Sequence, residues 1–347
     1  MTLNQSRYPY IIAEMSGNHG NSLERALKLV KAAHDSGADA IKIQSFTAES
    51  MTIDSRNSEF VISNKESPWY GYSLFDLYKE SSMPKEWHES IFTCARSLGI
   101  EPFSSPFDFE AVDLLQSLNC QIYKIASFEI LDIPLIKYVA KTGKPIILST
   151  GMASLSEIND AVTAARAEGC SDLTLLKCTS TYPTLPIYSN LATIPHLAAC
   201  FNTRVGLSDH SLGVAIPIAS VALGAVVIEK HLTLSHDDQT VDSFFSLDPI
   251  EFKQMVQGCK AAFDALGDVH YGPTEPESSS IHRRRSLYFT SDLLPGDRLK
   301  PADIRSVRPG LGLPPKYFDN VVGLTLSKSV KRGMPLSWDV FRDSSPK

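Results

Sequence analysis

Residues 204–211 read RVGLSDHS, residues 226–233 read VVIEKHLT, and a Pro-containing segment of helical character lies between them. Each stretch is a short apolar run typical of a buried strand, so the unit predicts two strands joined by a helix. A histidine, His210 or His231, closes each apolar run. One such histidine is most often a packed or surface residue. Two imidazoles at neighbouring strand ends, however, are what a divalent metal ion needs from a protein scaffold.

Six further segments upstream have the same form, which makes eight predicted strands. The upstream six are YIIAEMS (10–16), AIKIQSF (40–46), EPFSSPF (101–107), QIYKIAS (121–127), PIILSTG (145–151) and LTLLKCTS (173–180). Strands that alternate with helices indicate a parallel sheet, and eight such units predict a closed (β/α)8 TIM barrel. An open doubly wound sheet is the alternative, and it is disfavoured because no Gly-x-Gly-x-x-Gly turn follows the first strand.

Helix borders can also be read from the sequence. Residues 21–24 (NSLE) and 154–157 (SLSE) predict capping-box starts. Glycines that follow the helical segments predict left-handed C-terminal caps at Gly37, Gly99, Gly143, Gly169 and Gly224. Residues 51–88 form a long interruption between the second strand and the next predicted helix, which is typical of a lid or specificity element, with a partner contact as the alternative.

Polar side chains stand at the carboxyl ends of all eight predicted strands, where TIM barrels place their reaction site. A single serine or lysine there is usually only a solvated strand end. The convergence of two histidines, several lysines and many hydroxyls favours a metal ion beside an anionic, phosphorylated ligand. The residues are Glu14, Lys42, Gln44, Ser104, Ser105, Lys124, Ser127, Ser149, Thr150, Lys177, Ser180, Asp209, His210, Glu229, Lys230 and His231.

The composition is that of a globular enzyme, with 347 residues of which 43% are hydrophobic and 21% charged. No apolar stretch approaches the roughly 18 residues of a membrane helix, and the first ten residues do not resemble a secretory signal. The six cysteines are scattered without Cys-x-x-Cys pairing, which favours reduced thiols and a cytoplasmic location.

Charge is distributed unevenly along the chain. Residues 283–347 carry 13 Lys and Arg against 6 Asp, a net charge of +7, whereas the remainder has a net charge of −13. Because the basic region has no aromatic-interleaved patch, it favours docking onto an acidic domain over nucleic-acid binding. Residues 267–282 are rich in Gly, Pro and Ser, as in a linker. The expected organisation is a barrel over 1–266, a linker over 267–282 and a small β-rich domain over 283–347.

A family resemblance runs from about residue 10 to residue 340. IIAEMSGNHGNSLERAL, AIKIQSFTAESMTID, YKIASFE, ILSTGM, LLKCTSTYP, GLSDHSLG, VIEKHLTL and the terminal RRSLYF, PGD and VRPG resemble the sialic acid synthase family. The family implies a TIM barrel followed by an antifreeze-like (SAF) domain. It also implies a domain-swapped homodimer, in which the SAF domain of one chain covers the barrel mouth of the other. Neither a membrane nor a nucleic acid is an expected partner.

The resemblance implies condensation of phosphoenolpyruvate with an open-chain N-acetylated sugar aldehyde, which yields an α-keto acid and phosphate. It identifies His210 and His231 as ligands of Mn²⁺ or Mg²⁺, which acts as a Lewis acid on the aldehyde. Glu14 corresponds to the family carboxylate that serves as general base. The phosphoenolpyruvate-binding positions are Lys42, Ser105, Lys124, Ser127, Ser149, Ser180 and Ser208. The sugar-binding positions are Gln44, Tyr182, Asp242 and, from the partner's tail, Arg308.

The sequence departs from the family pattern at several of these positions. Ser105 stands where many relatives have Thr, and Lys177 and Ser180 replace the His and Asn of neuraminate synthases. Residues 240–241 read Thr-Val where pseudaminic-type members usually have Gly-Pro, which predicts a different bend in the loop before Asp242. Pseudaminic-type members are nonetheless the most similar, and they imply 2,4-diacetamido-2,4,6-trideoxy-L-altrose as the sugar.

Alternative functions stay open at this point. N-acetylmannosamine, or the diacetamido mannose analogue that leads to legionaminic acid, would fit the same residue pattern. A class II metal-dependent pyruvate aldolase also uses histidines and a divalent ion. A class I aldolase with Lys124 as the Schiff-base lysine is disfavoured, because an anionic ligand keeps a lysine charged. A non-catalytic sugar-binding protein is disfavoured by the intact set of site positions.

Overall fold

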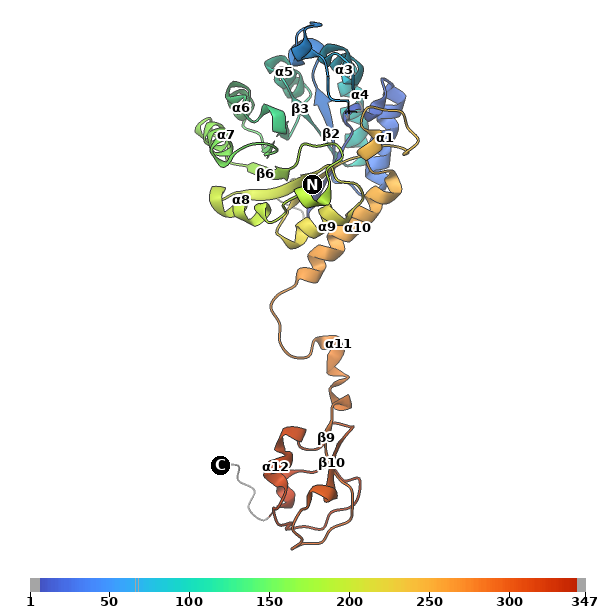
Figure 1. The fold of residues 1–347 in the computed structure, drawn as a ribbon, viewed down its shortest axis with the longest axis vertical. Helices are drawn as coiled ribbons and strands as arrows, with labels where there is room; N and C mark the ends of the chain where they lie inside the picture. The colour runs from blue at the N-terminus through green and yellow to red at the C-terminus, as the bar shows by residue number, and fades with distance from the viewer. Residues whose placement is uncertain (1–6, 66, 68, 342–347) are drawn as a thin grey trace. The chain divides into compact units, whose positions relative to one another are not determined.

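The computed structural model describes residues 7–65, 67 and 69–341, and the chain forms two compact units, Met1–Gly267 and Asp268–Lys347 (Figure 1). Each unit has its own cluster of buried apolar side chains. The two clusters share no residue, so each unit encloses a separate hydrophobic core.

The first unit is a closed barrel of eight parallel strands in chain order, with β8 paired to β1, which confirms the predicted TIM barrel. All eight predicted strands are present, and each ends one or two residues before its predicted end. The strands are β1 (Tyr10–Glu14), β2 (Ala40–Ser45), β3 (Glu101–Pro106), β4 (Tyr123–Ile125), β5 (Ile146–Ser149), β6 (Leu173–Cys178), β7 (Arg204–Asp209) and β8 (Val227–His231).

The pairing register aligns several candidate site residues across neighbouring strands. Glu14 on β1 lies level with Lys42 on β2 and with His231 on β8. Ser208 on β7 lies level with Glu229 on β8. Residues at one level of a parallel barrel form a layer, so these side chains belong to two successive layers that point to the same face of the sheet.

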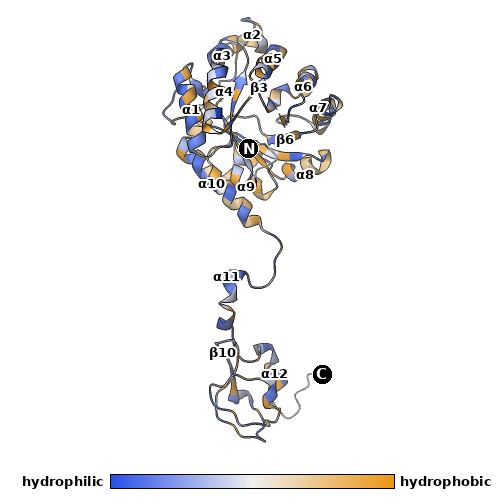
Figure 2. Ribbon diagram, turned by 180° about the vertical axis from the view of Figure 1, so that it is seen from behind, coloured by the Kyte–Doolittle hydropathy of each residue, from blue (hydrophilic) through white to orange (hydrophobic). Residues whose placement is uncertain are grey.

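Helices surround the strands, and Figure 1 shows α5, α6, α7 and α8 following one another around the outside. In α1 the buried residues Ala26, Leu29, Val30 and Ala33 recur at helical spacing, so one stripe faces the barrel. Figure 2 shows hydrophilic and hydrophobic residues alternating along these helices. The helices are α1 (Leu23–Asp35), α2 (Ala48–Met51), α3 (Leu74–Ser81), α4 (Trp87–Leu98), α5 (Phe109–Ser117), α6 (Ile133–Ala140), α7 (Leu155–Ala167), α8 (Thr193–Phe201), α9 (Ala215–Ala222) and α10 (Pro249–Leu266).

The helix ends confirm one of the two predicted capping boxes. Ser154 and Glu157 form the box at the start of α7. At the start of α1, Ser22 accepts a hydrogen bond from the amide of Arg25, so the third helical position holds Arg25 and the predicted box with Glu24 is wrong. The five glycines predicted to end helices all have left-handed φ angles, between 70° and 92°.

The segment 51–88 is more ordered than a plain interruption. It contains a 3-10 turn at Ser58–Phe60 and the helix α3, which Ser73 caps by accepting a hydrogen bond from Asp76 N. The expectation of no helix between β2 and α4 is therefore wrong. The helix escaped notice because it is short and has no fully buried residue, which leaves only a weak apolar stripe in the sequence.

In the second unit, β9 (Ser286–Phe289) and β10 (Ile304–Val307) form an antiparallel pair beside the short helix α12 (Phe318–Val321). The segment expected to be a linker contains one short helix, α11 (Glu275–Ser278). Within the described residues of the chain, no helix is long and apolar enough to cross a membrane.

Candidate active site

A cavity of about 470 Å³ opens at the carboxyl ends of the barrel strands. It is lined by charged and polar side chains together with a group of apolar ones. Predicted site residues in its lining are Lys42, Gln44, Lys124, Ser127, Ser149, Tyr182, Ser208, His210, His231 and Asp242.

The other predicted residues lie as follows. Glu14 and Ser105 are buried directly behind Lys42, with which both are in contact. The hydroxyl of Ser180 lies 3.7 Å from the thiol of Cys178, which lines the cavity. Arg308 belongs to the second unit, where it follows β10. The barrel therefore brings together the residues to which the resemblance assigns a role, except Arg308. Of the wider set of strand-end residues, Asp209 and Lys230 pair with each other, and Ser104, Thr150 and Lys177 do not line the cavity either.

Two lysines and two glutamates form a buried charged cluster at one end of the cavity. Lys42 Nζ lies 2.6 Å from Glu14 Oε2 and 3.8 Å from Glu229 Oε2. Lys124 Nζ lies 3.6 Å from Glu229 Oε1. Buried ion pairs of this kind compensate for lost hydration only in part, which leaves both ammonium groups suited to a further anion.

Glu229 is the central member of this cluster and has no predicted role. It accepts a hydrogen bond of 2.9 Å from the Ser208 hydroxyl in addition to its two lysine contacts. One signal in the sequence could have found it. Glu229 is two residues before His231 on the same strand, so the two side chains point to the same face of the barrel sheet.

The charged cluster shifts the acid–base properties of its members. Burial raises the pKa of the Glu14 carboxyl, Lys42 opposes this, and the net pKa is about 7. Burial also disfavours the charged form of Glu229, but Lys124 and Lys42 outweigh it and lower the pKa of that carboxyl. Two carboxyls in one cluster thus have pKa values pushed apart, and Glu14 is the one able to take up and release a proton near neutral pH.

The two histidines fit a divalent metal ion. Burial disfavours the charged form of His210, but Cys178 outweighs it and raises the pKa. His210 Nδ1 lies 3.0 Å from the carbonyl oxygen of Thr179, so in the neutral form Nδ1 carries the proton and Nε2 keeps its lone pair for a cation. His231 is buried, and its Nδ1 has no hydrogen-bond partner among the residues that the structure describes. The ring centroids are 5.3 Å apart. Neutral imidazoles beside a carboxylate suit Mn²⁺ and related ions.

Aromatic side chains hold the two imidazoles in place. The Phe245 ring centroid lies 4.8 Å from that of His231 and 6.2 Å from that of His210. The Tyr182 ring lies 4.4 Å from the His210 ring. Burial lowers the pKa of His231 well below its usual value, and the His210 ring adds to the effect. A low pKa keeps His231 neutral, as a metal ligand must be.

Hydroxyl groups lie around the charged cluster, where they can bind an anion. The buried Ser149 hydroxyl has no hydrogen-bond partner in the described part of the protein. Ser127 Oγ accepts a hydrogen bond from Gly151 N and is also hydrogen-bonded to the Cys178 side chain. A side chain at Gly151 would collide with the hydroxyls of Ser180 and Ser127, at 2.2 Å and 2.7 Å from an added Cβ. The glycine therefore allows both serines to approach the strand end.

Asp242 is held in the cavity although its loop departs from the family pattern. Its Oδ2 accepts a hydrogen bond of 3.2 Å from Gly17 N. Thr240, one of the two departing residues, donates a hydrogen bond of 2.7 Å to the side-chain oxygen of Asn18. The loop is thus tied to the segment after β1 by side-chain contacts, and the aspartate lines the cavity as the spacing predicts.

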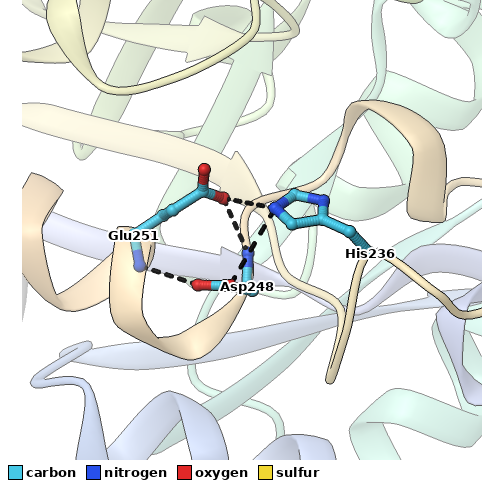
Figure 3. A group of neighbouring side chains, drawn as sticks. All are labelled: His236, Asp248 and Glu251. Carbon is cyan, nitrogen blue, oxygen red and sulfur yellow. Dashed lines mark hydrogen bonds and ion pairs between the residues drawn. The ribbon is translucent and has the colours of Figure 1, made fainter.

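A second group of potential metal ligands lies outside the cavity. Figure 3 shows His236, Asp248 and Glu251 pointing toward one another at the start of α10. Asp248 and Glu251 form the capping box of that helix, and His236 Nε2 lies 2.8 Å from Glu251 Oε2. Helix capping and the exposed contacts of His236 with both carboxylates account for this arrangement, so the group carries no metal assignment.

Two family models match the chain. Residues 29–271 match the NeuB family and residues 284–342 match the SAF domain. The pseudaminic acid synthase of Helicobacter pylori is 42% identical over 334 residues, which are 95% of this chain and 97% of the relative. The pseudaminic acid synthase of Campylobacter jejuni is 43% identical over 339 residues, 98% of each chain. A solved structure, N-acetylneuraminic acid synthetase from Leptospira borgpetersenii in complex with citrate, is 32% identical with a TM-score of 0.71, and the match covers 81% of this chain and 94% of that one.

Proposed function

The chain belongs to the NeuB family, and on this basis we propose that it condenses phosphoenolpyruvate with 2,4-diacetamido-2,4,6-trideoxy-L-altrose to form pseudaminic acid and phosphate. The observation that carries the proposal is the identity of 42–43% with pseudaminic acid synthases over nearly the whole chain. The cavity supports it, because it combines an anion-binding end with two histidines, and Glu14, a carboxyl of pKa about 7, lies directly behind Lys42 of its lining.

Lys42 and Lys124 would bind the phosphate and carboxylate of phosphoenolpyruvate. Both ammonium groups are buried and would donate charge-assisted hydrogen bonds to the ligand. Glu14 and Glu229 already offset the two lysines, so the divalent cation would supply further positive charge for a trianionic ligand. Ser149 and Ser127 supply hydroxyl donors at the end of β5 and after β4. Phosphoenolpyruvate would also be bound by Ser105, Ser180 and Ser208. Ser105 would contribute by accepting a hydrogen bond from Lys42 and so positioning that ammonium group.

In the reaction, carbon 3 of phosphoenolpyruvate attacks the aldehyde carbon of the sugar, and water adds to carbon 2. The water gives one proton to Glu14, and one proton in turn ends on the former aldehyde oxygen, which becomes a hydroxyl. The remaining proton of the added water leaves with the phosphate as the keto group forms. His210 and His231 would hold the divalent cation, Mn²⁺ or Mg²⁺, which supplies Lewis-acid polarisation of the aldehyde. Gln44, Tyr182 and Asp242 would orient the sugar chain.

We also propose that Arg308 reaches the sugar from the partner chain of a domain-swapped homodimer. Exposed apolar side chains after β4 to β7 support an interface at the barrel mouth. They are Phe128, Leu131, Met152, Leu155, Leu185, Ile187, Tyr188 and Leu212. The basic tail, a net +7 against −13 for the rest, supports docking of the tail on the acidic barrel. All six cysteines are free, which supports the proposed cytoplasmic location.

The test is to incubate the protein with phosphoenolpyruvate, Mn²⁺ and one of three sugars, and to measure released phosphate. The sugars are the diacetamido altrose, N-acetylmannosamine and the diacetamido mannose analogue. We expect the fastest release with the first. Turnover of N-acetylmannosamine alone would contradict the assignment. A class II aldolase would instead use pyruvate, release no phosphate and cleave the product in reverse.

A further inference from the structure

The residues assigned to chemistry leave one side of the cavity unexplained. That side is apolar and comes from the residue that follows β2 and from the segment 51–88, which the sequence predicts to be a lid or specificity element without assigning a role to any of its residues. We call it the apolar wall, and define it as Phe46, Met51, Ile62, Trp69, Leu74 and Leu77.

Backbone and side-chain contacts hold the apolar wall in place without a ligand. Ile62 N donates to Tyr72 O and Gly71 N donates to Ile62 O, both at 2.9 Å, which closes a hairpin around Ile62. Arg56 binds the carboxylate of Asp76 across the same segment. Asn21 Nδ2 donates a hydrogen bond of 3.0 Å to Glu80 O and so ties the end of α3 to the barrel. A preformed apolar surface selects ligands at low entropic cost.

Most of the wall is left partly exposed to the cavity. Ile62, Trp69, Leu74 and Leu77 are half-buried, whereas Phe46 is 7% exposed because it packs against Phe107 and Tyr78. When an apolar part of a ligand covers half-buried apolar side chains, it removes their remaining surface from water, and this makes the free energy of binding more favourable. The wall therefore predicts a substrate with apolar groups on the part that lies away from the charged cluster.

The proposed sugar has such groups in the required place. Its aldehyde carbon must lie at the charged end, where phosphoenolpyruvate is bound, so its far end extends away from that cluster. The far end carries the carbon-6 methyl and the carbon-4 acetamido methyl, where N-acetylmannosamine carries hydroxyls. We propose that the apolar wall, through Ile62 and Leu77, selects sugars that have methyl groups at this end. This inference rests on the proposed function.

The size of the effect can be bounded. One methyl or hydroxyl in an apolar pocket changes selectivity by about 10- to 200-fold. We therefore expect polar substitutions of Ile62 or Leu77 to reduce the preference for the 6-deoxy sugar by about 10-fold or more. Binding of phosphoenolpyruvate should not change, because neither side chain belongs to the charged cluster.

The experiment compares Ile62→Ser and Leu77→Gln with Ile53→Ser. Ile53 lies in the same segment but is 68% exposed and does not line the cavity. The readout is the inhibition constant of two unreactive sugar alcohols, each reduced at carbon 1. In one of them carbon 6 is a methyl group, and in the other carbon 6 is a hydroxymethyl group. The KM for phosphoenolpyruvate and the thermal unfolding midpoint serve as checks of the site and the fold.

We expect the first two variants to bind the 6-deoxy alcohol about 10-fold more weakly with little change for the other, and Ile53→Ser to behave as the unsubstituted protein. An unchanged ratio, or equal weakening for both alcohols, would overturn the inference. If the unsubstituted protein releases no phosphate with any of the three sugars, the proposed function fails. If phosphate is released but the ratio of the two inhibition constants does not change in the variants, the proposed function stands and only the role of the apolar wall is wrong.

Discussion

Lys230 Nζ lies 2.6 Å from Asp209 Oδ2, and both side chains are almost completely buried. The two residues are register partners on β8 and β7. Each directly precedes one of the two site histidines, His231 and His210. Alternation along a strand places the ion pair on the face of the sheet opposite to the histidines. The pair thus links the two strand ends from behind, where it touches neither the cavity nor its ligands.

Replacement of Lys230 by Met should destabilise the barrel. It would leave the Asp209 carboxylate buried without its counter-ion, at a cost of about 3–5 kcal/mol in the free energy of unfolding. Denaturant unfolding measures this change. Lys28→Met, which removes a surface ion pair with Glu24, is the matched control and should change the stability little. Equal free energies of unfolding for the two variants would show that the buried ion pair does not contribute to the stability of the barrel.

Replacement of His210 by Ala should abolish tight Mn²⁺ binding, because only one imidazole would remain. Isothermal titration calorimetry of the full chain measures this directly. His236→Ala, in the exposed group at the start of α10, should bind Mn²⁺ as the unsubstituted protein does. Loss of Mn²⁺ binding in His236→Ala, with binding retained in His210→Ala, would show that the ion binds at the exposed group and that our assignment to the two cavity histidines is wrong.

Activity should fall as the pH drops through about 7. Glu14 must be ionised to accept a proton from water, and its pKa in the free protein is about 7. A bound cation favours the carboxylate, so it moves this transition to lower pH, never higher. The pH profile of kcat/KM measures the transition. Glu14→Gln should lower kcat by at least about 100-fold. Normal turnover in this variant would exclude Glu14 as the base.

Replacement of Gly151 by Ala should weaken phosphoenolpyruvate binding. The new Cβ would lie 2.2 Å from Ser180 Oγ and 2.7 Å from Ser127 Oγ, so both hydroxyls must move. Loss of two donors to a charged ligand predicts a KM for phosphoenolpyruvate raised by at least about 10-fold. Steady-state kinetics with a saturating sugar test this. An unchanged KM for phosphoenolpyruvate in a folded Gly151→Ala protein would contradict this placement of the two hydroxyls.

Two inactive variants should restore activity when their chains are mixed. In a domain-swapped dimer, a chain with Arg308→Ala keeps a sound barrel and a chain with His231→Ala keeps a sound tail. Random reassembly would give about a quarter of the normal sites, because half of the dimers contain one complete site. Phosphate release after denaturation and joint refolding measures this. No recovery, with each variant folded, would argue for sites built within one chain.

Sequence patterns predicted most of the barrel because its signals are local. Apolar runs of strand length, glycines after helices and the Ser154 cap each depend on a few neighbouring residues. The predictions that were wrong depended on weak local signals: the Ser22 cap is displaced by one residue, and α3 has no fully buried stripe. The wall built on α3 was for that reason not foreseen.

By itself, the sequence determined which residue types stand at the strand ends, including His210 and His231, because strand periodicity and polar termini are written in consecutive residues. The tertiary structure alone decided which of these side chains meet. Glu229 became the partner of Lys42, Lys124 and Ser208, and Lys230 turned away to Asp209, because barrel closure and register bring residues from distant strands to one level. Contacts across a closed sheet depend on the alignment of whole strands, and no stretch of the chain encodes that alignment alone.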